Sequence, residues 1–228
     1  MGAESGGRII KTGIPGLDNI TGGGLPRGGM VLLTGDTGTG KTTLAYEFLV
    51  RGALQGENGM IVTSNTPVEK FLSQLMPFSF CRGEVPGEGI KVMPMNCDHL
   101  DIDGHLEVIG GIAQAVKDAG ARRLMIDPLP RSLLELEESQ LVTVLNGLSS
   151  TLYDNGITTM MVTDVMHHVA LSMADGVVHL EAEDREGDVL RTVQVRKLRG
   201  CTHSLSRYAM MLSKEGTIMS RLIRRSWE

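Results

Sequence analysis

The amino-acid sequence predicts an α/β fold, with a mostly parallel sheet flanked by helices and extended by antiparallel strands toward the C-terminus. Two observations lead to this prediction. Up to residue 175, short apolar runs alternate with segments of helical periodicity, as in repeated strand–helix units. Beyond residue 175, strand follows strand, with turn segments at residues 184–188 and 214–216. Since no linker, low-complexity run or internal repeat interrupts the chain, we expect one domain over residues 1–228.

The first strand and the first long helix have the clearest signals. Met30–Thr34 is a short apolar run bounded by glycines, which indicates a buried strand. Leu44 and Phe48 lie on one face of a helix that we expect over residues 42–55. Further strands are expected at residues 59–63, 90–93, 123–126, 158–163, 177–180, 189–195 and 207–212. Further helices are expected at residues 67–75, at 105–119 before Gly120, and along Leu141, Leu145, Leu148 and Leu152 before Gly156, with a loop over 76–89.

Composition and charge narrow the class of protein. Hydrophobic residues make up 41% of the chain and charged residues 21%, which excludes a disordered or fibrous protein. The formal net charge of −5 gives no general attraction to nucleic acid. Three scattered cysteines favour reduced thiols over a disulfide framework. The chain contains no apolar run long enough to span a membrane and no signal-peptide core, so we expect a soluble, cytoplasmic protein.

The strongest motif is G-D-T-G-T-G-K-T, which fits the phosphate-loop pattern G-x-x-x-x-G-K-[ST] at every required position, between a predicted strand and a predicted helix. Its glycines let backbone N–H groups surround phosphate oxygens, and the helix start adds its positive dipole end. Lys41 is expected to reach the β- and γ-phosphates, and the Thr42 hydroxyl to ligate Mg²⁺. The nucleotide-binding residues are predicted to be Gly35, Asp36, Thr37, Gly38, Thr39, Gly40, Lys41, Thr42 and Thr43.

A phosphate loop needs an acidic partner at the end of a buried strand, where it holds Mg²⁺ directly or through water. Asp127 closes the strand at 123–126 and precedes a proline, whereas Asp164 follows the strand at 158–163. Either carboxylate also suits a helix N-cap or a turn. We favour Asp127 for the Mg²⁺ shell and keep Asp164 as a polar sensor of the phosphate.

Beyond the phosphate loop, the chain resembles the KaiC-like branch of the RecA superfamily of ATPases from about residue 9 to about residue 220. The resemblance lies in the lead-in T-G-I-P-G-L-D and G-G-G-L-P-R-G, in the strand start A-D-G-V-V, and in K-L-R-G with His203 three residues on. It implies a RecA-like core that assembles side by side, commonly as a homo-hexameric ring, with ATP at each subunit boundary.

The same resemblance implies that Lys197 and Arg199 reach across to the γ-phosphate of a neighbouring subunit, with His203 as a weaker third residue. Cations at that position neutralise charge that develops during phosphoryl transfer. On the sequence pattern alone, the alternative is that Arg191, Arg196, Lys197 and Arg199 form the solvated face of a hairpin strand.

The chain departs from the resembled family after the second strand. KaiC-like ATPases carry adjacent glutamates there, one of which activates the attacking water, but this chain has Ser64 and Asn65. Neither side chain accepts a proton at neutral pH, and Glu69, one helical turn on, has the wrong spacing for the family. We therefore predict slow hydrolysis or none, which leaves open whether the protein is an enzyme.

Residues 97–105 contain two histidines, three aspartates and a cysteine, but they fit neither a calcium loop nor a zinc spacing. We expect Asp101 or Asp103 to cap the following helix instead.

Three functions compete. The favoured one is an ATP-binding regulatory or signalling protein that forms a ring and binds a protein partner. The second is a recombinase-related, DNA-binding ATPase. The segments that would face DNA, residues 128–140 and 164–173, contain Arg131 as their only lysine or arginine, with Glu135, Glu137 and Glu138 close by. The third is an ATPase motor. The absence of the family's glutamates at positions 64 and 65 argues against this function.

Overall fold

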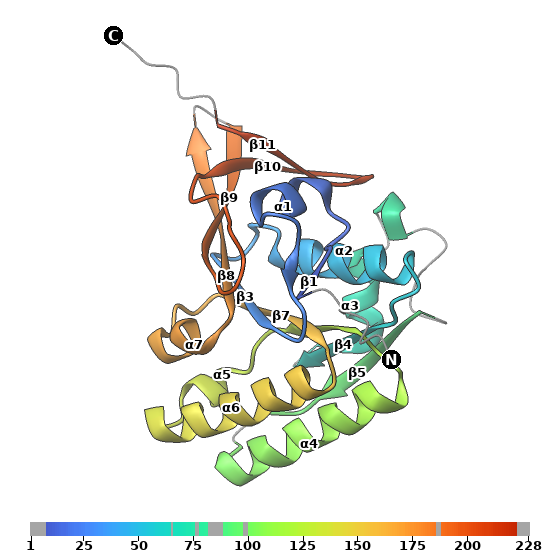
Figure 1. Ribbon diagram of the computed structural model, residues 1–228, viewed down its shortest axis with the longest axis vertical. Helices are drawn as coiled ribbons and strands as arrows, with labels where there is room; N and C mark the ends of the chain where they lie inside the picture. The colour runs from blue at the N-terminus through green and yellow to red at the C-terminus, as the bar shows by residue number, and fades with distance from the viewer. Residues whose placement is uncertain are drawn as a thin grey trace, which may run out of the picture.

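A computed structural model describes residues 8–64, 66–75, 78–81, 89–97, 100–185 and 188–222. Nine strands form one sheet in the order β11-β10-β9-β8-β3-β7-β6-β4-β5 (Figure 1). The six strands from β8 to β5 pair in parallel, and β9, β10 and β11 are added as antiparallel neighbours. The predicted α/β architecture with a C-terminal antiparallel extension is therefore confirmed. The strands are β3 (Met30–Thr34), β4 (Gly59–Ser64), β5 (Ile90–Met95), β6 (Arg123–Asp127), β7 (Thr158–Thr163), β8 (Gly176–Arg185), β9 (Asp188–Leu198), β10 (Tyr208–Ser213) and β11 (Gly216–Arg221).

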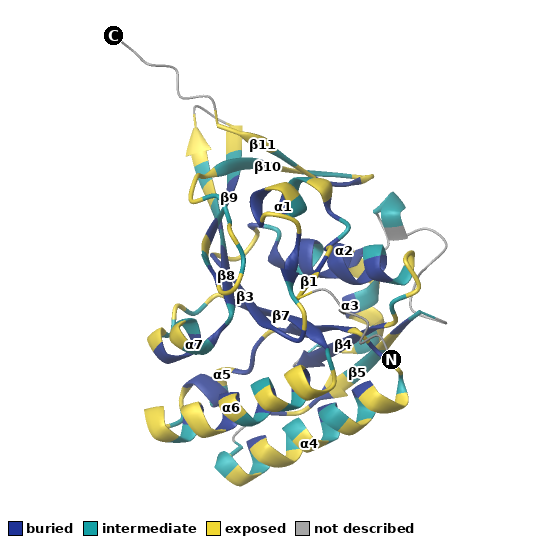
Figure 2. Cartoon of the chain, in the orientation of Figure 1, coloured by how far each residue is buried: buried dark blue, intermediate teal, exposed yellow. Residues whose placement is uncertain are grey.

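Helices cover both faces of the parallel strands. The helices are α1 (Pro15–Ile20), α2 (Lys41–Ala53), α3 (Val68–Leu75), α4 (Ile102–Asp118), α5 (Arg131–Leu134), α6 (Glu138–Asp154) and α7 (His168–Met173). In β3, Val31 and Leu33 pack with α1 and α2, whereas Met30 and Leu32 pack with α4 and α6. The helices α4 and α6 each have an exposed side, whereas α2 is buried along most of its length (Figure 2). The fully buried strand β3 therefore lies between two packed cores and carries the phosphate loop at its carboxyl end.

Helix boundaries follow local capping chemistry. Asp101 caps α4, because its carboxylate accepts the N–H of Gly104 at 2.9 Å, and the helix therefore begins three residues before the predicted start. Gly120 and Gly156, with φ of 58° and 65°, follow α4 and α6 as predicted. No group of three or more potential metal ligands occurs among the described residues; Asp98 and His99 lie outside them.

The sequence analysis missed five elements that are too short to show a period, which are β1 (Ile9–Ile10), β2 (Leu25–Pro26), α1, α5 and α7. It also missed β11, which pairs with β10 along its whole length. Within the predicted loop at 76–89, Ser79–Cys81 form one turn of 3₁₀ helix, and residues 76–77 and 82–88 lie outside the described part of the chain. Among the helices of the described residues, none is long and apolar enough to cross a membrane.

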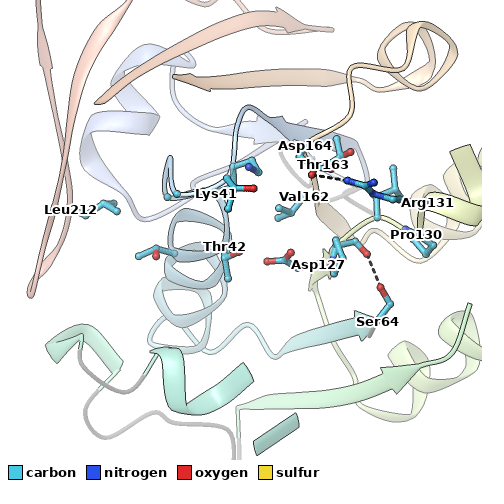
Figure 3. Close-up of a pocket in the computed structure, with 16 residues that line it drawn as sticks. Lys41, Thr42, Ser64, Asp127, Pro130, Arg131, Val162, Thr163, Asp164 and Leu212 are labelled. Carbon is cyan, nitrogen blue, oxygen red and sulfur yellow. Dashed lines mark hydrogen bonds and ion pairs between the residues drawn. The ribbon is translucent and has the colours of Figure 1, made fainter. Parts of the chain in front are cut away.

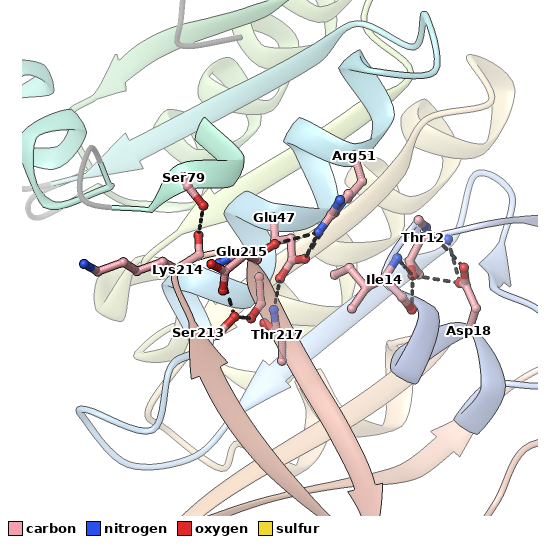
Figure 4. A network of polar contacts seen from close by, with 12 residues as sticks. Thr12, Ile14, Asp18, Glu47, Arg51, Ser79, Ser213, Lys214, Glu215 and Thr217 are labelled. Atoms are coloured by element: carbon pink, nitrogen blue, oxygen red, sulfur yellow. Dashed lines mark hydrogen bonds and ion pairs between the residues drawn. The ribbon is translucent and has the colours of Figure 1, made fainter. Parts of the chain in front are cut away.

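A buried carboxylate ties α2 to the antiparallel extension. Glu47 on α2 is fully buried and accepts the backbone N–H of Thr217 at 2.7 Å (Figure 4). Its other oxygen pairs with Arg51 at 3.0 Å, and Arg51 also donates to the carbonyl oxygen of Glu215. The β10–β11 hairpin is thus held against the helix that carries the phosphate loop.

Candidate functional site

The loop between β3 and α2 has the backbone that its glycines predict. Gly35, Gly38 and Gly40 have φ of 137°, 83° and 101°, conformations that other residues rarely adopt. A Cβ at Gly35 would collide with the carbonyl oxygen of Leu180 on β8, and one at Gly38 would meet only open space. Glycine at 35 therefore permits close packing of loop and sheet, while glycine at 38 leaves the backbone accessible to a ligand.

Lys41 lies at the base of this loop and is only 8% exposed. Its Nζ donates to the carbonyl oxygens of Gly35 at 2.6 Å and Asp36 at 2.7 Å. Burial lowers the pKa of Lys41, and the charges of Asp164, Asp127 and Asp36 oppose that shift. The ammonium group is thus held beside the accessible backbone of the loop. There, phosphate oxygens would replace the carbonyl oxygens that now accept its hydrogen bonds.

A cavity of about 470 Å³ opens in front of the loop (Figure 3). Its lining comes from the phosphate loop and the start of α2, from the ends of three parallel strands, from the segments after β6 and β7, and from β10. The lining residues are Thr37, Gly38, Gly40, Lys41, Thr42, Thr43, Ser64, Asp127, Pro128, Leu129, Pro130, Arg131, Val162, Thr163, Asp164 and Leu212. The site therefore lies at the carboxyl ends of the strands, where parallel sheets bind ligands.

Asp127 meets Thr42 in this cavity although the two residues are far apart in the chain. Asp127 is 7% exposed, and burial raises the pKa of its carboxyl to about 6, against the opposing effects of a hydrogen bond with Thr42 and the charge of Lys41. Its Oδ2 is buried and has no hydrogen-bond partner among the described residues. A carboxylate oxygen without a partner beside a hydroxyl group is the donor set that Mg²⁺ uses next to a phosphate loop.

Replacing Asp127 with asparagine is expected to stabilise the nucleotide-free protein near neutral pH. Because the folded pKa of about 6 lies above the ordinary value of 3.8, the fold favours the protonated carboxyl. The stability that Asp127 contributes is therefore fully present below about pH 4 and lost as the pH rises through about 6, a change on the order of 3 kcal/mol. Urea unfolding of both proteins across this range measures it.

The exposed Asp184→Asn variant is the matched control for this charge change and is expected to follow the wild-type pH profile. An Asp127→Asn protein whose stability relative to wild type does not change between acidic and neutral pH would contradict the prediction.

Asp164 and Arg131 form an ion pair at the mouth of the cavity. Asp164 follows β7, whose residue Thr163 lies beside Thr34 at the end of β3, so Asp164 faces the phosphate loop. Its Oδ2 lies 3.1 Å from the Arg131 guanidinium, and both side chains are largely exposed. This location fits the predicted role of Asp164 near the phosphate, and Arg131, which the sequence offered only as an isolated basic residue, partly neutralises it.

A model of the KaiC ATPase family matches residues 10–221. The chain belongs to the KaiC family of ATPases. A UPF0273 protein of Methanopyrus kandleri is 29% identical, with 91% of this chain and 90% of that protein covered. The circadian clock protein KaiC3 of Synechocystis is also 29% identical, but the match covers 92% of this chain and 45% of that longer protein. A KaiC-like protein of Pyrococcus horikoshii has a solved structure with TM-score 0.77 and 31% identity, covering 93% of this chain and 98% of that one.

The KaiC-family chain carries a serine at the cavity where the resemblance predicts a carboxylate. Ser64 ends β4, is buried, and donates its hydroxyl to the carbonyl oxygen of Pro128 at 3.3 Å. Asn65 lies outside the described residues. Glu69 is exposed on α3 and is not among the described residues that line the cavity, whose carboxylates are those of Asp127 and Asp164.

Lys197 and Arg199, the proposed trans-acting pair, lie far from the chain's own phosphate loop. Gly176, at the start of β8, pairs with both Val31 at the start of β3 and Leu198 at the end of β9. The K-x-R segment therefore lies at the end of the sheet opposite to the loop that follows β3. This arrangement does not bring Lys197 or Arg199 to the nucleotide site of the same KaiC-family chain.

The two cations are also not a freely solvated strand face. The Lys197 ammonium donates to the carbonyl oxygens of Leu171 at 3.0 Å and Ser172 at 2.7 Å, and Arg199 donates to Ser172 at 2.8 Å. Both cations thus bind the last turn of α7, where the helix dipole favours positive charge. His203 is half-buried on the same segment, and its Nε2 has no partner among the described residues.

One residue near the loop was assigned no nucleotide-binding role from the sequence. Arg191 on β9 donates from Nε to the carbonyl oxygen of Gly38 at 3.3 Å. Since its position depends on the antiparallel register of β8 and β9, no local pattern could have identified it.

Proposed function

We propose that this KaiC-family protein binds ATP and Mg²⁺ in the cavity at the phosphate loop and acts as a regulatory or signalling protein with slow or no hydrolysis. The observation that supports it is the convergence of Lys41, Thr42 and Asp127 in one cavity, whose described lining residues include no carboxylate other than Asp127 and Asp164. Asp127 is expected to serve the metal, and Asp164 is paired with Arg131.

The residues of this chain then have separate roles toward the nucleotide. The accessible backbone N–H groups around Gly38 and the ammonium group of Lys41 bind phosphate oxygens. Thr42 and Asp127 hold the metal, which when bound supplies positive charge that screens the phosphates. Arg131 offsets the repulsion between Asp164 and the terminal phosphate.

The proposal includes assembly of several copies of the chain. Because Lys197 and Arg199 lie at the opposite end of the sheet from the loop, any contact they make with a nucleotide held in a phosphate loop involves the loop of another copy of the chain. This supports head-to-tail assembly with ATP at each boundary, for which the family resemblance implies a hexameric ring. We further propose that the whole chain acts as one domain and that a protein partner responds to the assembled state.

The test is the mass of the protein by light scattering with and without Mg·ATP, with phosphate release followed in the same samples. Assembly that depends on nucleotide, with phosphate release close to background, is the expected result. Release at the rate of a competent ATPase would contradict the proposed lack of a base. A monomer under both conditions would contradict the trans contacts, and salt-sensitive DNA binding tighter than micromolar would favour a recombinase-related function instead.

Replacing Ser64 with alanine is expected to leave phosphate release within about twofold of wild type, since a hydroxyl that donates to Pro128 accepts no proton from water. Phosphate release with saturating Mg·ATP measures this, and Thr63→Ala, at the preceding buried position, controls for packing. If the wild-type rate is substantial and falls strongly in Ser64→Ala alone, Ser64 takes part in hydrolysis.

A further inference from the structure

A second cavity, of about 620 Å³, lies close to the K-x-R segment, away from the phosphate loop. Among the described residues its lining contains three arginines and no carboxylate, in a chain whose net charge is −5. Its lining residues are Arg8, Pro26, Arg27, Tyr153, Gly156, Arg199, Gly200 and Cys201. Guanidinium groups gathered in one hollow focus a positive potential that attracts anions.

The fold brings these arginines together from three distant parts of the chain. Arg8 precedes β1 and Arg27 follows β2, and the backbone N–H of Arg27 donates to the carbonyl oxygen of Arg8 at 3.0 Å. Arg199 follows β9 and uses one guanidinium nitrogen to donate to Ser172. Since a guanidinium group has five N–H donors, Arg199 retains donors for a ligand.

The remaining lining suits a ligand that combines phosphate with a planar group. Tyr153, in the last turn of α6, is 71% exposed, and its ring offers an apolar face for stacking. Gly156 and Gly200 have φ of 65° and 72°, and a Cβ at Gly200 would meet nothing within 4 Å, so space over the backbone stays open there. Arginine is the side chain best suited to bidentate binding of phosphate oxygens.

Two carboxylates lie in the adjoining hollow, which shares Arg27 and Tyr153 with this cavity. The Asp175 carboxylate accepts the backbone N–H of Met30 at 2.9 Å and lies 3.9 Å from the Arg199 guanidinium. Asp154 is exposed at the end of α6. Neither carboxylate is among the described residues that line the arginine cavity, whose charged lining residues are all arginines.

We propose that Arg8, Arg27, Arg199 and Tyr153 form a binding site for the phosphate groups and base of a nucleotide. The nucleotide that binds there is either one held in the phosphate loop of a neighbouring copy or one free in solution, and the experiment below distinguishes the two. The first source rests on the function proposed above and extends the trans contact of Arg199 to residues that the family resemblance does not include. The second makes the cavity an independent site.

The test uses mant-ATP, a fluorescent ATP analogue, with Mg²⁺, and follows affinity, stoichiometry and assembly. The variants are Arg8→Gln with Arg27→Gln, Tyr153→Ala, and the loop variant Lys41→Ala. Lys117→Gln, which removes one exposed cation from α4, is the matched control. We expect the double arginine variant to weaken binding at the affected site at least tenfold, since it loses hydrogen bonds to a charged ligand, and Tyr153→Ala to weaken it less.

The two sources give different results. For a neighbour's nucleotide, wild type binds one mant-ATP per chain, and mixing Lys41→Ala with the double arginine variant restores nucleotide-dependent pairing of the two variants, which neither shows alone. For a free nucleotide, wild type binds two, and Lys41→Ala keeps one that the added arginine substitutions remove.

The proposal is overturned if the double arginine variant and Tyr153→Ala bind and assemble as wild type and Lys117→Gln do, with melting temperatures unchanged. Failure of the proposed function has another signature, since Lys41→Ala then binds mant-ATP with the same affinity and stoichiometry as wild type.

Discussion

Replacing Lys41 with alanine is expected to lower the affinity for Mg·ATP by roughly a hundredfold and to abolish nucleotide-dependent assembly. Lys41 supplies the one ammonium group at the base of the described loop, already desolvated and held by the carbonyl oxygens of Gly35 and Asp36. A charge in that low-dielectric position interacts with phosphate more strongly than an exposed lysine does. Fluorescence titration with mant-ATP measures the affinity.

The Lys41→Ala protein is expected to fold. The substitution removes two hydrogen bonds to loop carbonyl oxygens, but it also removes the desolvation cost of a buried ammonium group, and the two effects offset each other. Its melting temperature without nucleotide should therefore stay close to that of wild type, while saturating Mg·ATP should raise the melting temperature of wild type alone. Lys11→Ala, which removes an exposed cation, is the control. Equal stabilisation of wild type and Lys41→Ala by Mg·ATP would place the nucleotide outside the phosphate loop.

Replacing Arg123 with alanine is expected to lower the free energy of unfolding by about 3–5 kcal/mol, the largest stability effect we expect. Arg123 begins β6 and is 1% exposed. Its guanidinium pairs with Glu57 at 2.6 Å and donates to three backbone carbonyl oxygens, those of Lys11, Thr12 and Phe48, at 2.7–2.9 Å. It also lies 4.6 Å from the ring centre of Phe48. Truncation leaves these carbonyl groups without a donor and opens a cavity.

The neighbouring Arg122 is the matched control, since its side chain is exposed and donates to a single backbone oxygen, that of Asn155. Arg122→Ala is expected to change the free energy of unfolding by no more than about 0.5 kcal/mol. Urea unfolding of both variants measures the difference. A loss from Arg123→Ala as small as that from Arg122→Ala would show that water replaces the guanidinium group without cost.

The different burial of the two arginines could not be predicted from the local sequence. Both stand at the start of a predicted strand and look alike in composition, yet one is buried and the other exposed. Arg123 is buried because the N-terminal segment around Lys11 and the helix α2 meet over the start of β6. That meeting depends on the order of strands in the sheet, which no local pattern contains.

Local chemistry made other features predictable. The strand Met30–Thr34, the leucine face of α6 and the Asp101 cap of α4 follow from residues within a few positions of one another, and the structure has all three. The sequence analysis missed the two-residue strands β1 and β2 and the short helix α5, because segments this short cannot show a hydrophobic periodicity. The strands β1 and β2 bear on the proposed arginine site, since they bring Arg8 and Arg27 together.

By itself, the sequence determined the phosphate loop, its lysine and its threonine, because the glycine spacing that such a loop needs is contiguous in the chain. Only the tertiary structure decided that Asp127 meets Thr42 and that Asp164 is paired with Arg131. It also decided that Lys197 and Arg199 lie at the opposite end of the sheet and that three arginines share one cavity. The physical reason is that these relations are set by parallel strand order and antiparallel register, which bring together residues widely separated along the chain.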